Sequence, residues 1–171
     1  MLTKLSNSIR FINVHKKLDK TEKLVKFFFY LIVRPLILKI YDPQINYKIG
    51  KSTITLPLSH NLPMYQLLFG EYCQNLGRLS AIVKEKYKNL TMIDIGANVG
   101  DTIALLRKYS KFSVLAIEGN SDFFKILIKN SYKLKLTDPL CVLLGKSNNQ
   151  IKGKMSLDSG TAYFVKSEKG S

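Results

Sequence analysis

The alternation of apolar and polar positions predicts a strand hairpin and a helix in the first half of the chain. Residues 45–58, INYKIGKSTITLPL, alternate with a period of two, and Gly50 and Lys51 supply a turn between two runs. Further along, residues near 74–88 have apolar side chains at helical spacing, namely Leu76, Leu79, Ile82, Val83 and Tyr87. We therefore expect a β-hairpin followed by an amphipathic helix.

From residue 90 onward, short apolar runs alternate with helical patterns. Buried strands are predicted for LTMIDI (90–95), FSVLAIE (112–118) and PLCVLLG (139–145). Between them, TIALLRKY has a helix-like apolar face, and SDFFKILIKNSYKL is a second amphipathic helix with Ser121 as its expected N-cap. This order predicts an α/β fold, a parallel sheet with helices on both faces. The tail predicts a further hairpin around Asp158–Gly160.

The most hydrophobic stretch lies near the start, in residues 21–41, TEKLVKFFFYLIVRPLILKIY. Lys26, Arg34 and Lys39 interrupt it and Pro35 should break or kink a helix, so the stretch does not fit a spanning segment. No small-residue cleavage site follows, which argues against a signal peptide. Two roles remain open: a helix packed on the domain, or an interfacial helix that makes peripheral membrane contact.

The charge of the chain limits the classes of partner that we expect. The chain has 27 Lys+Arg against 12 Asp+Glu, a formal net charge of +15. Only four of the cations are Arg, the residue that base- and phosphate-reading sites favour, so we expect no nucleic-acid partner. The surplus of Lys is typical of a compositional bias. Residues 1–60 are the denser cationic part, with 11 basic and 3 acidic side chains.

The cysteines indicate a reducing, cytoplasmic location. Cys73 and Cys141 form no CxxC or zinc spacing, and His15 and His60 belong to no metal-ligand pattern, so no metal is expected. Cys141 stands in the apolar run LCVLL and should be a small buried residue.

The glycine turn MIDIGANVGDT, residues 92–102, is the stretch that indicates chemistry. Gly96 and Gly100 are four apart, and Asn98 stands where the dinucleotide fingerprint has its central glycine. No G-K-[ST] follows, which excludes a P-loop. Asp94, at the end of the strand, would repel a pyrophosphate on the helix N-terminus and attract an ammonium group.

A second carboxylate follows the next predicted strand. Glu118, 18 residues after Gly100, can accept hydrogen bonds from both hydroxyls of a ribose. Together with Asp94 it describes a nucleoside with a cationic or amino-acid tail, which fits S-adenosylmethionine better than NAD. Packing of the helix on the strand would explain Gly96 and Gly100, but not the two carboxylates.

The wording of these motifs resembles a known family. The segment DIGANVG, residues 94–100, resembles the first motif of class I S-adenosylmethionine-dependent methyltransferases. IDIGANVGDT and then AIEGNSDFFKILIKN resemble the FkbM-type family, whose pattern of Glu-Pro-Asn, Phe, Leu and Asn is matched here by Glu118, Asn120, Phe124, Leu127 and Asn130. Gly119 departs by replacing the usual proline. The lead-in LPLSHNLPMYQLL and NLGRLSAIV also resembles members associated with glycan modification, so the likeness covers about residues 50–150.

The resemblance implies a Rossmann-like sheet and a cofactor site. The implied S-adenosylmethionine-binding residues are Asp94, Gly96, Ala97, Asn98, Gly100, Thr102, Glu118 and Asn120. Two of them have an equally good local explanation. Asn120 favours turns in any case, and Thr102 can satisfy a backbone group in the first turn of its helix.

The resemblance also implies a later strand with a second acidic motif of the form K-I-D-V-E-G, which this sequence does not contain. We therefore expect an incomplete Rossmann-like methyltransferase sheet of three parallel strands with flanking helices and a C-terminal hairpin. Its expected regions are a helical extension (1–44), a hairpin and helix lead-in (45–89) and a partial S-adenosylmethionine-binding domain (90–171). A fragment, a truncated reading frame and a degenerate copy all fit, and no catalytic residue is assigned.

The expected function is O-methylation of a sugar, glycan or other small hydroxylated acceptor, with this chain holding the cofactor-binding half. The alternative is a non-catalytic remnant that acts as a nucleoside-binding or basic membrane-associated module, in the cytoplasm or at the inner face of the membrane. A sheet that ends at its third strand exposes an unpaired edge and apolar faces. We therefore expect the isolated chain to be poorly soluble or oligomeric, and to transfer no methyl group.

Overall fold

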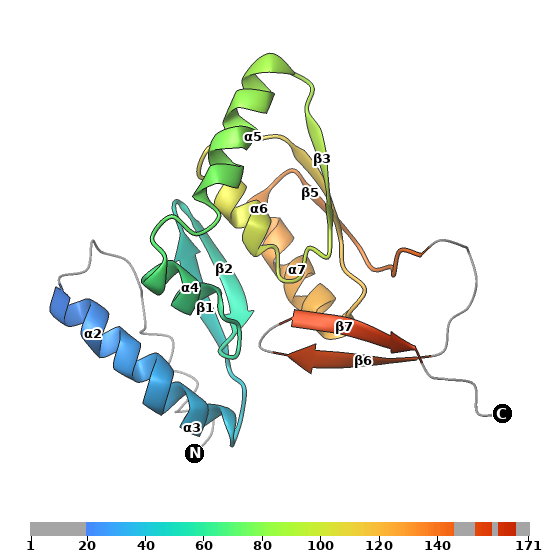
Figure 1. Cartoon of the computed structure of the whole chain (residues 1–171). Coiled ribbons are helices and arrows are strands. Elements are labelled where there is room, and N and C mark those ends of the chain that lie inside the picture. Colours follow the sequence, from blue (N-terminus) through green and yellow to red (C-terminus); the bar gives the residue numbers. More distant parts are fainter. Residues whose placement is uncertain (1–19, 146–152, 159–160, 167–171) are drawn as a thin grey trace.

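The computed structural model describes residues 20–145, 153–158 and 161–166. Figure 1 shows a helix at the N-terminal side, two hairpins, and a parallel sheet against which three further helices are gathered. Within these residues no helix is both long enough and apolar enough to cross a bilayer.

The N-terminal helix is continuous through the proline. It consists of α2 (Lys20–Phe28), a π-helical segment η1 (Phe29–Val33) and α3 (Arg34–Leu38), together called the α2–α3 helix. The amide of Arg34 donates to the carbonyl oxygen of Phe29, five residues back. Because Pro35 has no N–H and its ring crowds the preceding turn, a wider turn accommodates it. The break expected at Pro35 is thus replaced by a change of hydrogen-bond register.

The first predicted hairpin is confirmed. Strand β1 (Gln44–Ile49) pairs antiparallel with β2 (Ser52–Pro57), and Ile49 lies opposite Ser52 across the turn. Gly50 has a φ of +59°, a conformation that glycine adopts without strain. The odd-numbered positions of β1, Ile45, Tyr47 and Ile49, are buried, as the period of two requires.

Two helices follow, α4 (Leu62–Leu68) and α5 (Gln74–Lys86). The predicted helix α5 is confirmed, but its large apolar residues Leu76, Leu79 and Ile82 are exposed. Its buried positions are small, Gly77 and Ser80. A Cβ at Gly77 would overlap the ring of Tyr109, so the helix lies against its neighbour through its smallest residues.

The parallel sheet has the strand order β3-β4-β5, from β3 (Thr91–Ile95), β4 (Ser113–Ile117) and β5 (Thr137–Leu140). The first two strands are confirmed. The third is displaced: it begins two residues before the predicted range 139–145 and overlaps it only at Pro139 and Leu140. Residues 141–145, predicted to continue it, form no strand, and Cys141 is exposed rather than buried. Pairing with β4 ends at Leu140, which leaves the following residues without a ladder partner.

The sheet is covered on one face only within the described residues, which corrects the expectation of helices on both. Helices α6 (Asp101–Leu106) and α7 (Ser121–Leu134) lie on the same side of the sheet as α5 (Figure 1). On this covered face, Val114 and Ala116 have no exposed surface. On the other, open face, Ile93 is 61% and Ile95 67% exposed.

The hairpin and the sheet share one core. Residues of β1 and β2 pack with α6, α7 and β4 in a single hydrophobic cluster. A polar group sits inside it: the fully buried side chain of Asn130 accepts from the amide of Thr55 at 2.7 Å. It donates to the carbonyl oxygens of Thr55 and Val99, at 2.7 and 2.8 Å. One side chain thus joins α7, β2 and the glycine turn.

The C-terminal hairpin is also confirmed. Strands β6 (Gly153–Asp158) and β7 (Thr161–Lys166) pair antiparallel with Asp158 opposite Thr161. Residues 159–160, the centre of the predicted turn, lie outside the described residues. Ala162 packs against the core, which brings β7 close to the glycine turn.

Candidate functional site

The glycine turn between β3 and α6 is a tight loop with three residues at positive φ. These are Gly96 at +76°, Asn98 at +49° and Gly100 at +83°. The amides of Gly96 and Ala97 both donate to the carbonyl oxygen of Ile117, at 2.8 and 2.9 Å. The turn is thereby fixed to the end of β4, at the edge of the sheet where ligands of parallel α/β folds bind.

The two glycines have different surroundings. A Cβ at Gly100 would lie 3.1 Å from Leu127 and 3.2 Å from Leu134, so this glycine allows α7 to approach the start of α6. A Cβ at Gly96 would meet no atom of the described residues within 4 Å. Packing therefore accounts for the glycine at position 100. Gly96 instead allows a positive φ without strain beside open space, where a ligand could approach the backbone closely.

Glu118 links the ends of the two strands. Its carboxylate is buried and accepts from the amide of Asn98 at 2.8 Å and from the amide of Asn120 at 2.6 Å. An ionised carboxylate has about four acceptor positions, so two backbone donors leave capacity for further hydroxyl groups. Glu118 thus shapes the turn whether or not it contacts a ligand.

Asn120 has a clear local role. Its Oδ1 accepts from the amides of Asp122 and Phe123, at 2.9 and 3.0 Å, which makes it the N-cap of α7. The N-cap predicted at Ser121 was therefore wrong by one residue, because Ser121 is already helical. Asn120 bonds the first free amides of the helix with its side chain, and Ser121 has no such role here.

Asp94 is the unusual group of the site. Its Oδ2 is buried and has no hydrogen-bond partner among the residues that the structure describes. Burial, reinforced by the charges of Asp101 and Glu118, raises the pKa of Asp94 to about 6. Within the described residues, the ion pairs are Arg78–Glu71 and Lys125–Asp122, and neither involves these three carboxylates. A protein of net charge +15 thus holds a group of acids here that no cation of the described residues pairs with.

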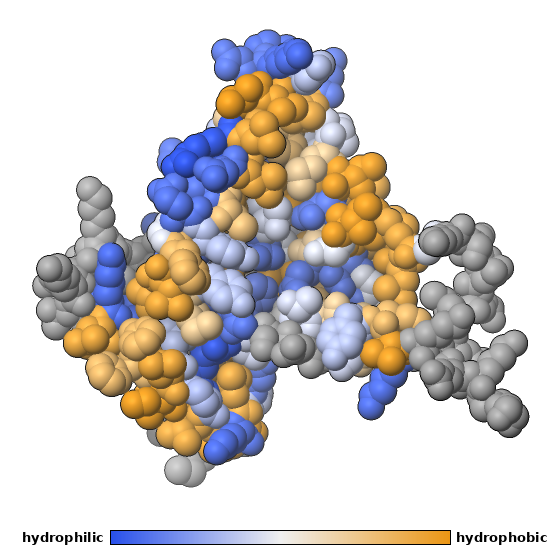
Figure 2. All heavy atoms as spheres, viewed as in Figure 1, coloured by the Kyte–Doolittle hydropathy of each residue, from blue (hydrophilic) through white to orange (hydrophobic). Residues whose placement is uncertain are grey.

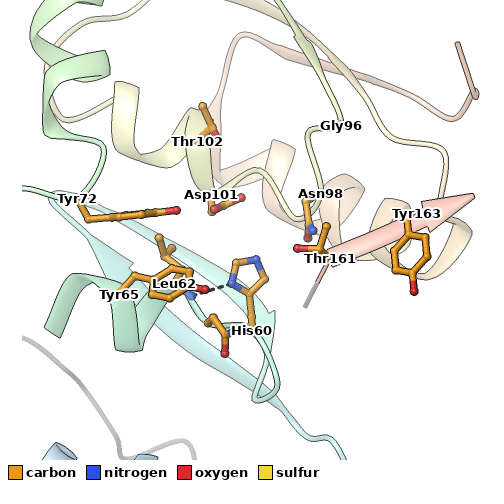
Figure 3. A pocket seen from close by; sticks show the side chains of 11 residues that line it. His60, Leu62, Tyr65, Tyr72, Gly96, Asn98, Asp101, Thr102, Thr161 and Tyr163 are labelled. Carbon is orange, nitrogen blue, oxygen red and sulfur yellow. Dashed lines mark hydrogen bonds between the residues drawn. The ribbon is translucent and has the colours of Figure 1, made fainter. Parts of the chain in front are cut away.

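A cavity of about 560 Å³ opens beside the turn (Figure 3), within the usual range of ligand sites. Its walls come from the turn and α6, from the segment around α4, and from β7. The lining residues are His60, Asn61, Leu62, Tyr65, Tyr72, Gly96, Asn98, Asp101, Thr102, Thr161 and Tyr163.

The predicted cofactor residues divide into two groups around this cavity. Three of them line it: Gly96, Asn98 and Thr102. The other five surround the turn without lining the cavity, and they are Asp94, Ala97, Gly100, Glu118 and Asn120. The structure thus brings the whole predicted set to one end of the sheet, three residues in the cavity wall and five in or beside the turn.

His60 contributes a hydrogen-bond donor that the sequence did not predict. Its Nδ1 accepts from the amide of Leu62 at 3.2 Å, so the neutral ring carries its proton on Nε2. Burial lowers the pKa of His60 more than the neighbouring Asp101 raises it, which keeps the ring neutral at pH 7. In Figure 3 the ring stands at the cavity opposite Asn98 and Thr161. His60 is therefore placed as a donor rather than as a base.

Sequence reasoning also missed Tyr65, Tyr72 and Asp101. The two tyrosine rings lie 5.3 Å apart between centroids, and burial raises the pKa of Tyr72. Asp101 follows the second glycine directly, and that adjacency was the available signal. Nothing in the local pattern of residues 60–72 distinguishes a cavity wall from an ordinary helix and loop. Within the described residues, no group of three His, Cys, Asp or Glu side chains is placed to hold a metal ion.

In comparisons with known proteins, no family model, no curated protein and no solved structure matches the chain.

Proposed function

We propose that this chain binds S-adenosylmethionine at the β3–α6 turn, as the cofactor site of an FkbM-type class I methyltransferase that acts on a hydroxyl group of a sugar, a glycan or another small acceptor. The observation that carries the proposal is the buried, unpartnered Oδ2 of Asp94. A cationic ligand group beside the turn would compensate its charge, directly or through a water.

The charge of the site favours such a ligand over a phosphate. An unpaired carboxylate in a low dielectric costs free energy, which an ammonium or sulfonium group would recover. A pyrophosphate at the start of α6 would instead face Asp94 and Asp101, which argues against NAD. The open space at Gly96 gives such a ligand access to the backbone of the turn.

Glu118 supports the nucleoside part of the proposal. It lies within electrostatic reach of Asp94, and its carboxylate keeps free acceptor capacity beyond its two backbone donors. Ribose hydroxyls are suitable donors for that capacity. Asp94 and Glu118 would then hold the two ends of one ligand, the cationic tail and the sugar.

The bound cofactor would supply an electrophilic methyl group on its sulfonium, and the residues of this chain would position the reactants. Nε2–H of His60 can hold an acceptor oxygen at the cavity wall but cannot remove its proton in this tautomer. The tyrosines Tyr65 and Tyr72 provide flat walls for a sugar or similar ring. A base for the acceptor hydroxyl is not assigned.

Calorimetric titration of the full chain with S-adenosylhomocysteine tests the proposal. We expect binding by the wild type and a loss of about tenfold or more in affinity for Asp94→Asn and for Glu118→Gln. Asp138→Asn, an exposed acid on β5, is the matched charge control and should bind like the wild type. A parallel titration with NAD should show no binding. Absence of binding by the wild type, or equal losses in all three variants, would overturn the proposal and favour the non-catalytic alternative.

A further inference from the structure

The α2–α3 helix turns polar side chains toward the protein and apolar side chains outward, the reverse of an ordinary surface helix. Toward the body it buries Tyr30 and the charged Arg34, along with the partly buried Phe29, Ile37 and Leu38. Its outward side has large apolar residues that are each more than half exposed. Four of them recur every four residues and, with Ile40 just after the helix end, form the outer stripe: Leu24, Phe28, Ile32, Leu36 and Ile40. Val25 and Leu31 beside the stripe are also more than half exposed. A helix that served only to cover the core would turn such residues inward.

The π-helical segment keeps the outer stripe on one side. Its members are spaced by four residues, and in an α-helix each step of four drifts by about 40° around the axis. The wider turn of η1 (Phe29–Val33) rotates less per residue and offsets part of this drift. The same spacing places Lys26, Tyr30 and Arg34 along the inner side. The change of register at Pro35 therefore aligns an apolar face instead of interrupting it.

Arg34 fixes the helix in this orientation. Its Nε donates to the carbonyl oxygen of Leu58 at 2.8 Å, and its Nη2 donates to Oδ1 of Asn61 at 2.8 Å and to the carbonyl oxygen of Ser59. Its guanidinium also lies 5.8 Å from the ring centroid of Tyr30. A buried guanidinium with these partners cannot leave without large cost. The helix is thus held by its polar side, and the outer stripe is left to face an external surface.

The charges near the outer stripe favour an anionic surface. The exposed Lys23 and Lys39 accompany it, with Glu22 as the opposing charge on the helix. The net charge of +15 attracts the chain to a negative surface. Figure 2 shows the apolar residues of this region as a broad patch at the lower left, over α2 and α3.

We propose that the outer stripe of the α2–α3 helix docks on an anionic lipid bilayer, with its axis parallel to the membrane. The apolar residues would enter the boundary between headgroups and acyl chains, and the lysines would contact anionic headgroups. The inference does not depend on S-adenosylmethionine binding.

The absence of tryptophan makes a site-specific test straightforward. In the full chain, Phe28→Trp introduces one reporter in the outer stripe, and Leu79→Trp introduces one on the similarly exposed face of α5. With vesicles of phosphatidylcholine and phosphatidylglycerol, we expect a blue shift and quenching by brominated lipid for the first variant and neither for the second. A response at Leu79→Trp alone, or at both sites equally, would overturn the assignment to this helix.

Vesicle co-sedimentation gives the energetic test. The triple variant Leu24→Gln, Phe28→Gln, Ile32→Gln should lose about tenfold or more in partitioning. The matched triple Leu76→Gln, Leu79→Gln, Ile82→Gln on α5 should bind like the wild type. Lys23→Gln with Lys39→Gln should also weaken binding about tenfold, and raised salt should do the same.

Three results would contradict the proposal. Wild type that binds no vesicles would overturn it outright, and so would equal binding to neutral and anionic vesicles. The third is a wild-type dimer that the outer-stripe triple variant converts to a monomer without lipid, which would assign the face to self-association instead. Circular dichroism of each variant excludes loss of fold as the cause.

Discussion

Strand β3 has an acidic side chain on its covered side and apolar side chains on its open side, the opposite of what a strand with one solvated face usually shows. On the covered side, Met92 packs against the core and is followed by Asp94, an acid with an unpartnered oxygen. On the open side, Ile93 and Ile95 face outward. A strand with one solvated face normally has its polar residues outside. Here the charge is inside and the isoleucines are outside.

This difference indicates that the sequence of β3 (Thr91–Ile95) combines two features, an acid suited to binding and apolar residues suited to a sheet covered on both faces. Asp94 lowers stability where it stands, as binding groups commonly do, while Ile93 and Ile95 have the pattern of a strand that is covered on both faces. Helix α5 repeats the second feature, because its large apolar residues also face outward. Leu76 and Leu79 border an apolar groove on the covered side, together with Met92. The covered side should therefore respond strongly to substitution, and the open side weakly.

The largest effect is expected at the polar centre of the covered side. Asn130→Leu removes three hydrogen bonds and leaves the buried amide and carbonyl of Thr55 and the carbonyl of Val99 without partners. We expect a loss of about 4 kcal/mol in the free energy of unfolding, measured with urea. Asn75→Leu, at an exposed position on α5, is the control and should change it by less than about 0.5 kcal/mol. Similar values for both variants would contradict the role of Asn130 as a link.

Next in size is the contrast between two apolar residues on opposite sides of the sheet. Leu127, fully buried on α7 next to Gly100, should cost about 3 kcal/mol when replaced by Ala. Ile95→Ala, on the open face, should cost less than about 1 kcal/mol, because little of that side chain is buried. Equal losses in chemical denaturation would mean that the open face is covered in solution.

A smaller, pH-dependent effect is expected at Asp94. Its folded-state pKa of about 6 exceeds the ordinary value of 3.8, so folding favours the protonated form. The contribution of protonated Asp94 to the free energy of unfolding is fully present below about pH 3.8 and is lost as the pH rises through about 6. Asp94→Asn should therefore melt a few degrees above the wild type at pH 7.5, with the gap closing toward pH 4. A constant gap in thermal melts across this window would disprove the ionisation argument.

The same titration sharpens the proposed function. A cationic ligand needs the ionised form of Asp94, so affinity for S-adenosylhomocysteine should rise as the pH increases through about 6. The Asp94→Asn variant, more stable but weaker in binding, should show no such rise. Calorimetry at several pH values measures both.

The smallest effect on stability is expected on the open face. Ile93→Gln with Ile95→Gln should change the free energy of unfolding by less than about 1 kcal/mol but reduce self-association of the chain. Light scattering against concentration measures the association, with Leu24→Gln and Ile32→Gln as the control pair on another exposed apolar face. A wild type that is monodisperse and monomeric would contradict the expected association.

The sequence predicted the elements well because each has a strong local period. Helix α7 has the predicted bounds, Ser121–Leu134, and both hairpins are where their turns indicated. The sequence predicted less well which side of each element is buried and which is exposed. The periodicity of α5 identifies an apolar stripe, but only the close contact of Gly77 with Tyr109 decides that this stripe points outward.

The candidate site divides in the same way. The turn and its two carboxylates were accessible to sequence reasoning because glycine spacing and strand ends are local features. His60, Tyr65 and Tyr72 come to the cavity from a segment more than twenty residues upstream, through long-range packing that no short motif encodes. The displaced β5 and the exposed Cys141 have the same origin, since a ladder partner decides where a strand ends.

The hydrogen bonds of Arg34 tie two distant events together. They hold Ser59 and Asn61, the residues on either side of His60, so the helix and one wall of the cavity are a single mechanical unit. On a bilayer, such a unit would set the height and tilt at which the cavity opens. An acceptor anchored in the same leaflet would then meet the site by sliding in two dimensions instead of diffusing in three, and the length of its tether would decide which acceptors can reach it.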